Sequence, residues 1–244
     1  MEVHHSHVEK KRFKDYLLEG LMIFVAVTIG FFAESFREHL SNKEKEHEYI
    51  KSLINNLADD TANINYSIQE NQYKIKNLDS LLLLGGKNLN DNHLRRQLYI
   101  FSGKSVSSYT GYGSNDATMM QLKNAGGLQY IKHNHIADSI AAYDNLLKGI
   151  YSAEIPYANA INNAMNALSE LLVFRAARDT TFFNGNDNGK EIPLLTTDPV
   201  KVEMFFNKIS LERGWTKNYV DNLIERRPFM IRLIVLLKKE YHVE

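Results

Sequence analysis

The fold is decided by residues 50–86, which read IKSLINNLADDTANINYSIQENQYKIKNLDSLLLLGG. Apolar side chains recur there at intervals of three, four or seven positions, the spacing that places them on one face of an α-helix. They are Ile50, Leu53, Leu57, Ile64, Ile68, Ile75, Leu78 and Leu82. Gly85 and Gly86 form a typical C-terminal break. We therefore predict a nearly continuous helix that ends near Leu84, with this face in the core of a bundle rather than in a long independent coiled coil.

An apolar segment precedes this helix, and residues 21–33 read LMIFVAVTIGFFA. The strictly apolar stretch reaches roughly 20 Å as a helix, whereas the hydrocarbon core of a bilayer is about 30 Å thick. A span must therefore include Leu17, Leu18 and Phe36, so we expect a transmembrane helix over residues 17–36. The alternatives are a cleaved signal peptide, since KKRFK precedes the segment, and a buried helix of a soluble protein. Because AESFREHL follows instead of an A-x-A-like cleavage site, we favour a retained anchor.

Basic residues indicate the orientation of this span. A tight cluster precedes it and a more dispersed set follows: Lys10, Lys11, Arg12 and Lys14 before, Arg37, Lys43 and Lys45 after. The positive-inside rule then predicts a short cytoplasmic tail over residues 1–16 and an extracytoplasmic domain over residues 37–244. In a bacterium this corresponds to an inner-membrane protein whose periplasmic domain begins with a stalk-like helix.

Three residues of the span are candidates for interaction. Ala26 and Gly30 are four positions apart, a small-xxx-small pattern that lets two membrane helices approach closely. Glu19 is an ionisable group at or just inside the membrane, which makes it a functional candidate. Its neighbours Lys14 and Tyr16 favour the simpler interpretation of a carboxylate at the interface.

The remaining sequence predicts further helices and no strand. The first proline is Pro156, so long helices are permitted before it. We expect helices over 92–101, over 117–124, from 135 to 178 with a kink or a new start at Pro156, over 199–209, and over 216–241 with a bend at Pro228. The intervening residues 179–198 are predicted to be a loop, with a possible hairpin around Asn186. The expected fold is all-α, an irregular antiparallel helical bundle that follows the membrane and stalk helix.

Composition excludes several functions. The chain has 29 Lys+Arg and 29 Asp+Glu, a formal net charge of +0, which argues against a general nucleic-acid binder. Its count of 0 cysteines excludes disulfides, thiolate catalysis, zinc–thiolate sites and iron–sulfur clusters. A hydrophobic fraction of 44% is typical of a globular chain.

Searches for catalytic and metal-binding motifs also fail. His4, His5 and His7 form a short polar tract without an acidic partner in register, which makes a poor metal site. Residues 184–189 resemble the opening of an EF-hand, but the twelfth position is Leu195 instead of a bidentate glutamate, so a tight Asn/Gly turn is the preferred interpretation. We therefore predict no metal, no cofactor and no enzymatic activity.

Residues 102–116, SGKSVSSYTGYGSND, form a segment with a composition of its own. Tyr109 and Tyr112 are rigid aromatic residues among small polar ones, a combination favoured at binding surfaces. Tyr109 and Tyr112 are therefore candidates for a recognition surface. An ordinary connection packed over the bundle is the preferred interpretation.

Two stretches resemble an uncharacterised Bacteroidetes family of small single-pass membrane proteins. They are VTIGFFAESFRE, residues 27–38, and TMMQLKNAGGLQYIKHNHIADSIAAYDN, residues 118–145. The second is similar to the family at Leu122, Lys123, Ala125, Gly126, Leu128, Ile131, Lys132, Ile136, Ile140 and Tyr143. The Gly-Glu pair that precedes the span in this family is replaced here by Glu19-Gly20, at a longer distance from Gly30. The resemblance implies a membrane-anchored helical domain and supplies no activity.

These patterns lead to two functional hypotheses. The first is a single-pass, membrane-anchored interaction or scaffold protein, a subunit of a membrane complex. Its expected partners are the lipid bilayer and either further copies of itself or other membrane proteins, with no nucleic acid. The second is an extracytoplasmic ligand-sensing helical domain that signals through a partner protein.

Overall fold

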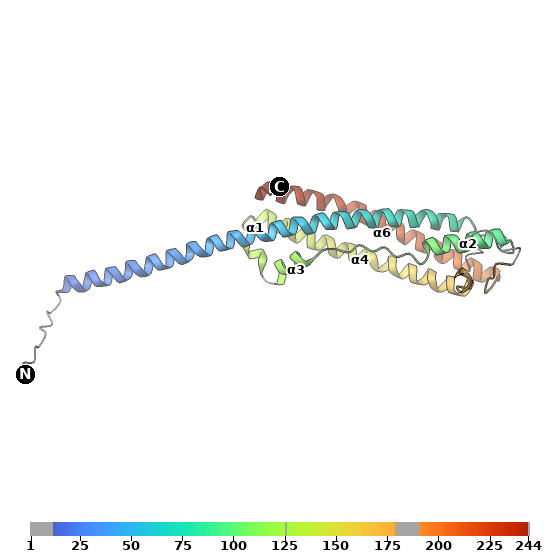
Figure 1. Cartoon of the computed structure of the whole chain (residues 1–244), viewed down its shortest axis with the longest axis horizontal. Helices are drawn as coiled ribbons and strands as arrows, with labels where there is room; N and C mark the ends of the chain where they lie inside the picture. The colour runs from blue at the N-terminus through green and yellow to red at the C-terminus, as the bar shows by residue number, and fades with distance from the viewer. Residues whose placement is uncertain (1–11, 125, 179–190, 244) are drawn as a thin grey trace, which may run out of the picture. The chain divides into compact units, whose positions relative to one another are not determined.

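The computed structural model describes residues 12–124, 126–178 and 191–243 (Figure 1). The chain divides into two compact units, Met1–Tyr49 and Ile50–Glu244. Helix α1, Phe13–Leu82, contributes to both units. This agrees with the nearly continuous helix predicted from the sequence. The tract around His4, the EF-hand-like turn at 184–189 and the hairpin expected around Asn186 lie outside the described residues.

In the first unit, α1 contains a stretch long and apolar enough to cross a membrane. The most apolar part of this helix has a mean hydropathy of 2.0 and is 0% buried. The core helix of a soluble protein would have buried these side chains. A signal sequence passes the same test of length and composition, so the finding by itself supports a candidate span.

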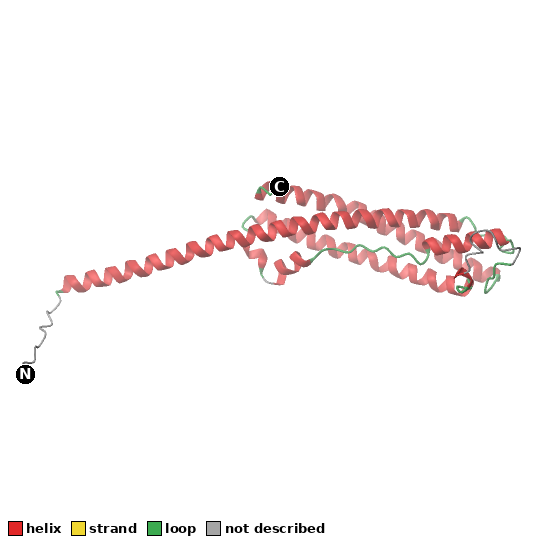
Figure 2. Ribbon diagram, in the orientation of Figure 1, coloured by secondary structure: helices red, strands yellow, loops and turns green. Residues whose placement is uncertain are grey.

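The second unit is built from helices and connecting loops (Figure 2). After residues 50–82 of α1 come α2 (Asn92–Ser105), α3 (Ala117–Asn124), the short helix η1 (Gly127–Tyr130), α4 (Asn134–Leu171), the short helix η2 (Ala176–Arg178) and α6 (Pro199–Tyr241). Among the described residues, the one pairing of extended backbone is an isolated bridge between Leu172 and Leu194. The predicted all-α class is confirmed.

Helix α6 runs antiparallel to both α1 and α4. Arg213 contacts Asp79 of α1, and Arg227, further along α6, contacts Asn65 of α1. The residue numbers of the partners on α1 thus decrease as the residue numbers on α6 increase. Helices α4 and α6 pack along each other (Figure 1). The antiparallel arrangement therefore joins the helices that follow one another directly, α4 and α6.

Helices α1 and α4 run in the same direction. Asp60 contacts Tyr143, and Asn71 contacts Tyr157, so residue numbers rise together along the two helices. The chain returns between them through α2, residues 106–116 and α3. An extended segment thus occupies part of the position that a fourth long helix would fill in a regular bundle.

The predicted apolar face of α1 lies in the core. Ile50, Leu53, Leu57, Ile64, Ile68 and Leu78 are buried, and Ile75 and Leu82 are partly buried. At the far end of the bundle this core continues into α2, α4 and α6 through Leu98, Leu168, Phe205 and Ile209. Burial of these side chains stabilises the bundle by about 1.5–3 kcal/mol for each fully buried large apolar residue.

The predicted boundaries are wrong for three helices, α6, α4 and α2. Helix α6 is a single element, where separate helices over 199–209 and 216–241 were expected. Gly214 costs an exposed helix about 1 kcal/mol, but the helix continues because buried Glu212, Thr216 and Tyr219 pack on either side of it. Helix α6 also continues past Pro228.

The second difference concerns α4, which ends at Leu171 instead of near 178. The amide of Leu195 donates to the carbonyl of Leu171 at 2.9 Å, so the segment that begins at residue 191 satisfies a carbonyl in the last turn of the helix. Pro156 lies inside α4 and does not start a new helix. Helix α2 extends to Ser105, beyond the predicted end at Phe101.

Candidate functional site

The most unusual feature of the bundle is a row of polar side chains on the core face of α1. The row, which we call the polar stripe, consists of Asp60, Asn63, Ser67, Asn71 and Lys74. Because residues three and four apart are neighbours on a helix surface, these side chains share one face. All of them except Asn63 are buried. Buried polar groups need hydrogen-bond partners, and here the partners lie in residues 106–116.

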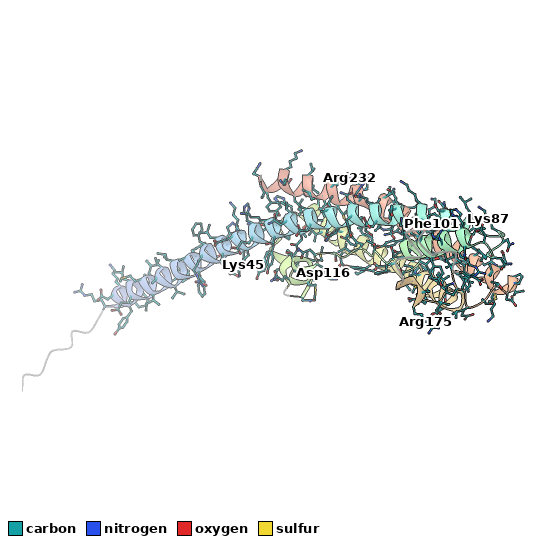
Figure 3. The ribbon with its side chains drawn as sticks, turned by 45° about the vertical axis from the view of Figure 1, so that its right-hand side comes forward. Lys45, Lys87, Phe101, Asp116, Arg175 and Arg232 are labelled. Atoms are coloured by element: carbon teal, nitrogen blue, oxygen red, sulfur yellow. The ribbon has the colours of Figure 1, made fainter. Side chains whose placement is uncertain are left out.

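The polar stripe binds this segment through main-chain atoms. The contacts are Lys74 Nζ to the carbonyl of Ser108 at 2.6 Å, Ser67 Oγ and Asn71 Nδ2 to the carbonyl of Thr110 at 3.0 and 2.8 Å, Asn63 Nδ2 to the carbonyl of Gly113 at 3.0 Å, and the amide of Asn115 to Asp60 Oδ1 at 2.6 Å. Figure 3 labels Phe101 on α2 and Asp116 at the start of α3, the two helices that the segment connects.

The geometry of helix and extended chain explains why the contacts stay in register. From residue 60 to residue 74 a helix advances about 21 Å, at about 1.5 Å per residue. From residue 108 to residue 115 an extended chain advances about 23 Å, at about 3.3 Å per residue. The two run in opposite directions, so successive polar side chains of α1 meet successive main-chain groups of the segment.

The main chain of this segment has side chains as its hydrogen-bond partners, in place of the main-chain groups of a helix or sheet. Within the described chain, residues 109–115 make no hydrogen bond to another main-chain atom. Tyr157 Oη accepts from the amide of Thr110 at 3.2 Å, and Tyr219 Oη accepts from the amide of Tyr112 at 2.8 Å. The segment is therefore attached by side chains from α1, α4 and α6.

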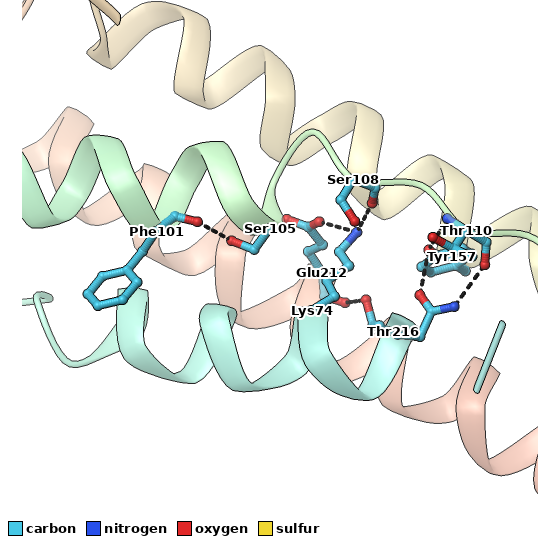
Figure 4. A network of polar contacts seen from close by, with 9 residues as sticks. Lys74, Phe101, Ser105, Ser108, Thr110, Tyr157, Glu212 and Thr216 are labelled. Atoms are coloured by element: carbon cyan, nitrogen blue, oxygen red, sulfur yellow. Dashed lines mark hydrogen bonds and ion pairs between the residues drawn. The ribbon is translucent and has the colours of Figure 1, made fainter. Parts of the chain in front are cut away.

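A buried ion pair lies at one end of the polar stripe (Figure 4). Lys74 Nζ is 2.8 Å from Glu212 Oε1, and the two side chains are 1% and 0% exposed. Lys74 Nζ also lies 5.2 Å from the centre of the Tyr157 ring. Among the described residues, Glu212 Oε2 has no hydrogen-bond partner. Burial raises the pKa of Glu212 to about 7 and lowers the pKa of Lys74, because a low-dielectric interior disfavours both charged forms.

Asp60 forms a second polar cluster at the other end. Its carboxylate accepts hydrogen bonds from the hydroxyl of Tyr143 and from the amide of Asn115. Burial raises its pKa, an effect that these two hydrogen bonds oppose. The buried ring of Tyr112 packs beside this cluster, and burial raises the pKa of its hydroxyl as well.

Stacked aromatic rings lie between the two clusters. Tyr157 stacks on Tyr219 with ring centres 4.7 Å apart and an angle of 3°, and on Tyr109 at 5.6 Å and 20°. The hydroxyl of Tyr109 donates to Glu154. A Cβ atom at Gly111 would overlap the Glu154 carboxylate and this hydroxyl, so the ends of these two side chains would have to move to admit one.

The structure separates the two tyrosines that are candidates for a recognition surface. Tyr112 is 3% exposed, whereas Tyr109 is 52% exposed. Only Tyr109 thus presents its ring to solvent. Glu19, Ala26 and Gly30 are exposed on α1 in the first unit. Space is open around Gly30, since an added Cβ would meet no atom of the described chain within 4 Å.

The polar stripe and Glu212 were not predicted from the sequence. The signal for the stripe is present, because Asp60, Ser67, Asn71 and Lys74 lie between the apolar positions of the same helix face. A purely apolar core face would have had hydrophobic residues at such positions. Nothing in the sequence pairs Lys74 with Glu212 of α6, which lies far along the chain.

The described residues include no group of three or more His, Cys, Asp or Glu side chains that could hold a metal ion. Two shallow clefts lie between α4 and α6, of about 170 and 180 Å³, and both are lined by Asn163 and Lys208. A third, of about 380 Å³, is lined by residues 86–90 and by part of the start of α6. These clefts lie apart from the buried polar groups of the stripe.

Fold and site define a class: a helical bundle in which a polar helix face binds an extended segment of its own chain. Comparisons with protein-family models, with curated proteins and with solved structures found no match. The function has to be inferred from the geometry of this chain itself.

Proposed function

We propose that this chain is a single-pass, membrane-anchored helical interaction protein that acts as a non-enzymatic subunit of a membrane complex. The observation that carries the proposal is α1, which contains both an exposed apolar stretch long enough to span a bilayer and the core face of the bundle. One helix thus provides an anchor and a structural support. On this proposal the lipid bilayer is the first partner.

The exposed side chains of the first unit support the anchoring role. Met22, Phe24, Phe31 and Phe32 are each about two-thirds exposed or more. Leaving such side chains in water is unfavourable, at about 25 cal/mol for each Å² of apolar surface. A bilayer removes them from water, and a helix satisfies its own backbone hydrogen bonds there. The basic cluster before the span favours a cytoplasmic N-terminus and a periplasmic bundle in a bacterial inner membrane.

An interaction role fits the second unit because the buried side chains of the polar stripe already have partners within the chain. Asn71 and Lys74 bind main-chain atoms of residues 106–116, so they are occupied by structure rather than turned toward a substrate. Outside the core, Met204, Leu211 and Trp215 of α6 are exposed beside the clefts on α4. Exposed aromatic and methionine side chains of this kind are enriched in protein interfaces.

Ligand sensing is the second candidate function. The cleft of about 380 Å³ at residues 86–90 reaches the size range of small-molecule sites, roughly 300–1,000 Å³. Its lining is largely loop residues and includes Lys87, Asn88, Asn90 and Glu203, which favours a small polar ligand. A thermal-shift screen of polar metabolites tests this candidate, since a ligand that binds the folded state raises its melting temperature.

Labelling of single cysteines tests anchoring and orientation together. The chain has 0 cysteines, so each introduced thiol is unique. We expect Lys14→Cys to react with a membrane-impermeant maleimide only after cells are lysed, and Lys43→Cys to react in cells with a permeabilised outer membrane. The protein should remain in the membrane pellet after a carbonate wash. Release of the full-length chain by carbonate would contradict the anchor, and the reverse labelling pattern would contradict the orientation.

A further inference from the structure

We propose that Lys74, Glu212 and residues 106–116 form a proton-sensitive latch, in which proton uptake by Glu212 favours the attached state of the segment. The latch is a property of the second unit and does not depend on the proposed membrane anchor.

The geometry couples the ion pair directly to the segment. Lys74 Nζ donates to the carbonyl of Ser108 at 2.6 Å and lies 2.8 Å from Glu212 Oε1 (Figure 4). The same ammonium group therefore holds the segment and compensates the buried carboxylate. Detachment of the segment removes a main-chain partner from Lys74 and opens a path for water to both charges.

Among the described residues, Lys74 is the cation that acts electrostatically on Glu212 and lowers its pKa. Helix α4 contributes Tyr157, which interacts electrostatically with Glu212. The Tyr157 ring stacks in turn on Tyr109 of the segment and on Tyr219 of α6. The nearby side chain from α2 is Ser105, whose hydroxyl donates to the carbonyl of Phe101 (Figure 4). Arg213, next to Glu212 in sequence, contacts Asp79 of α1 at 2.9 Å instead.

The segment can detach without unfolding a helix. Its residues 109–115 have side-chain partners in place of main-chain ones in the described chain. The free energy of opening is therefore the sum of the side-chain hydrogen bonds to the segment, each worth about 0.5–1.5 kcal/mol for neutral partners and more for charged ones, and of the burial of Val106 and Tyr112. Local openings have free energies that range up to that of global unfolding.

The direction of the pH effect follows from linkage. In the attached state burial raises the pKa of Glu212 to about 7, whereas a solvated glutamate has an ordinary pKa of 4.5. The state with the higher pKa binds the proton more tightly, so acidification from pH 7 to pH 5 favours attachment. The pKa of Lys74 is lowered in the attached state, so its contribution has the opposite slope and acts between that lowered pKa and 10.5.

Amide hydrogen exchange of the full chain between pH 5 and pH 7 tests the latch. The reporter is the amide of Thr110, which donates to Tyr157, after correction for the intrinsic exchange rate. We expect its protection factor to rise on acidification, by up to about ten-fold for each pH unit, the limit for one proton. Glu212→Gln should abolish the slope. Asp79→Asn, which breaks the neighbouring exposed pair, should retain it.

Asp60 is also buried and also has a raised pKa, but it binds the far end of the segment at Asn115. The test of Glu212 is therefore the difference between the wild type and Glu212→Gln in the pH slope of the protection factor at Thr110. If Glu212→Gln does not fold, the double variant Lys74→Met/Glu212→Leu replaces it, and it should show no slope. A flat profile in the wild type, or an unchanged slope in a variant that lacks the carboxylate, would overturn the proposal.

Discussion

Tyr157 and Asn71 together satisfy both main-chain groups of one residue, Thr110. Tyr157 Oη donates to Asn71 Oδ1 at 2.7 Å, and the same oxygen accepts from the amide of Thr110 at 3.2 Å. Asn71 Nδ2 donates to the carbonyl of Thr110 at 2.8 Å. Helices α1 and α4 are thus joined through a residue of the extended segment.

Tyr157→Phe should destabilise the second unit by about 1–3 kcal/mol, because it leaves the Asn71 carbonyl and the Thr110 amide buried without their partner. Urea unfolding measures the change. Tyr73→Phe is the matched control, since Tyr73 lies on α1 and is 52% exposed. Equal stability of the two variants would show that the Tyr157 hydroxyl contributes nothing.

Lys74→Met should cost about 3–5 kcal/mol at pH 8, because the variant must either keep the Glu212 carboxylate as an unpaired buried charge or protonate it at a pH above its usual range. The double variant Lys74→Met/Glu212→Leu should recover most of this loss, because it removes both desolvation costs. A double-mutant cycle by urea unfolding gives the coupling between the two residues. Additive losses would contradict the pairing.

The cost of Lys74→Met should also depend on pH. Because the pKa of Glu212 is raised in the folded wild-type chain, its contribution to stability is largest below pH 4.5 and falls as the pH rises toward about 7. Removal of the Lys74 cation raises the folded pKa of Glu212 further. The variant should therefore lose less stability at pH 5 than at pH 8, which unfolding curves at the two values will show.

Gly127→Ala should destabilise the second unit by about 1–3 kcal/mol, the usual cost of overpacking. The added methyl group at this first residue of η1 would lie 2.9 Å from the Cα atom of Leu122, a main-chain atom that cannot turn aside as the end of a side chain can. Gly113→Ala is the control, because an added Cβ there meets no atom of the described chain within 4 Å. Thermal unfolding should show a lower melting temperature for the first variant than for the wild type. The stability of the second variant should stay within about 0.5 kcal/mol of the wild type.

Gly30→Ile tests the proposed self-association through the span. If two copies meet at Ala26 and Gly30, the larger side chain should weaken the oligomer by about 3- to 30-fold, which corresponds to about 0.6–2 kcal/mol. Analytical ultracentrifugation in detergent measures the association constant. Gly20→Ile adds the same bulk outside the small-xxx-small pair. An unchanged constant for Gly30→Ile would exclude this contact face.

Much of the fold could be predicted from local periodicity. The recurrence of Ile50, Leu53, Leu57 and Ile64 gives a helix and its buried face, because a helix repeats about every 3.6 residues. The start of α6 followed from Asp198 and Pro199, and the structure shows Asp198 accepting from the amide of Val200 at 2.8 Å. The merger of two predicted helices into α6 was not predictable, because tertiary packing overrides the weak propensity of Gly214.

In the candidate site, too, one part could be predicted from local spacing and another part could not. The sequence by itself determined that Asp60, Asn71 and Lys74 share the apolar face of one helix, since that follows from spacing alone. Which groups they meet was decided by the tertiary structure, which brings residues 106–116 and Glu212 against that face. The reason is physical: a buried polar side chain requires a partner, but its spacing carries no information about which distant segment supplies one.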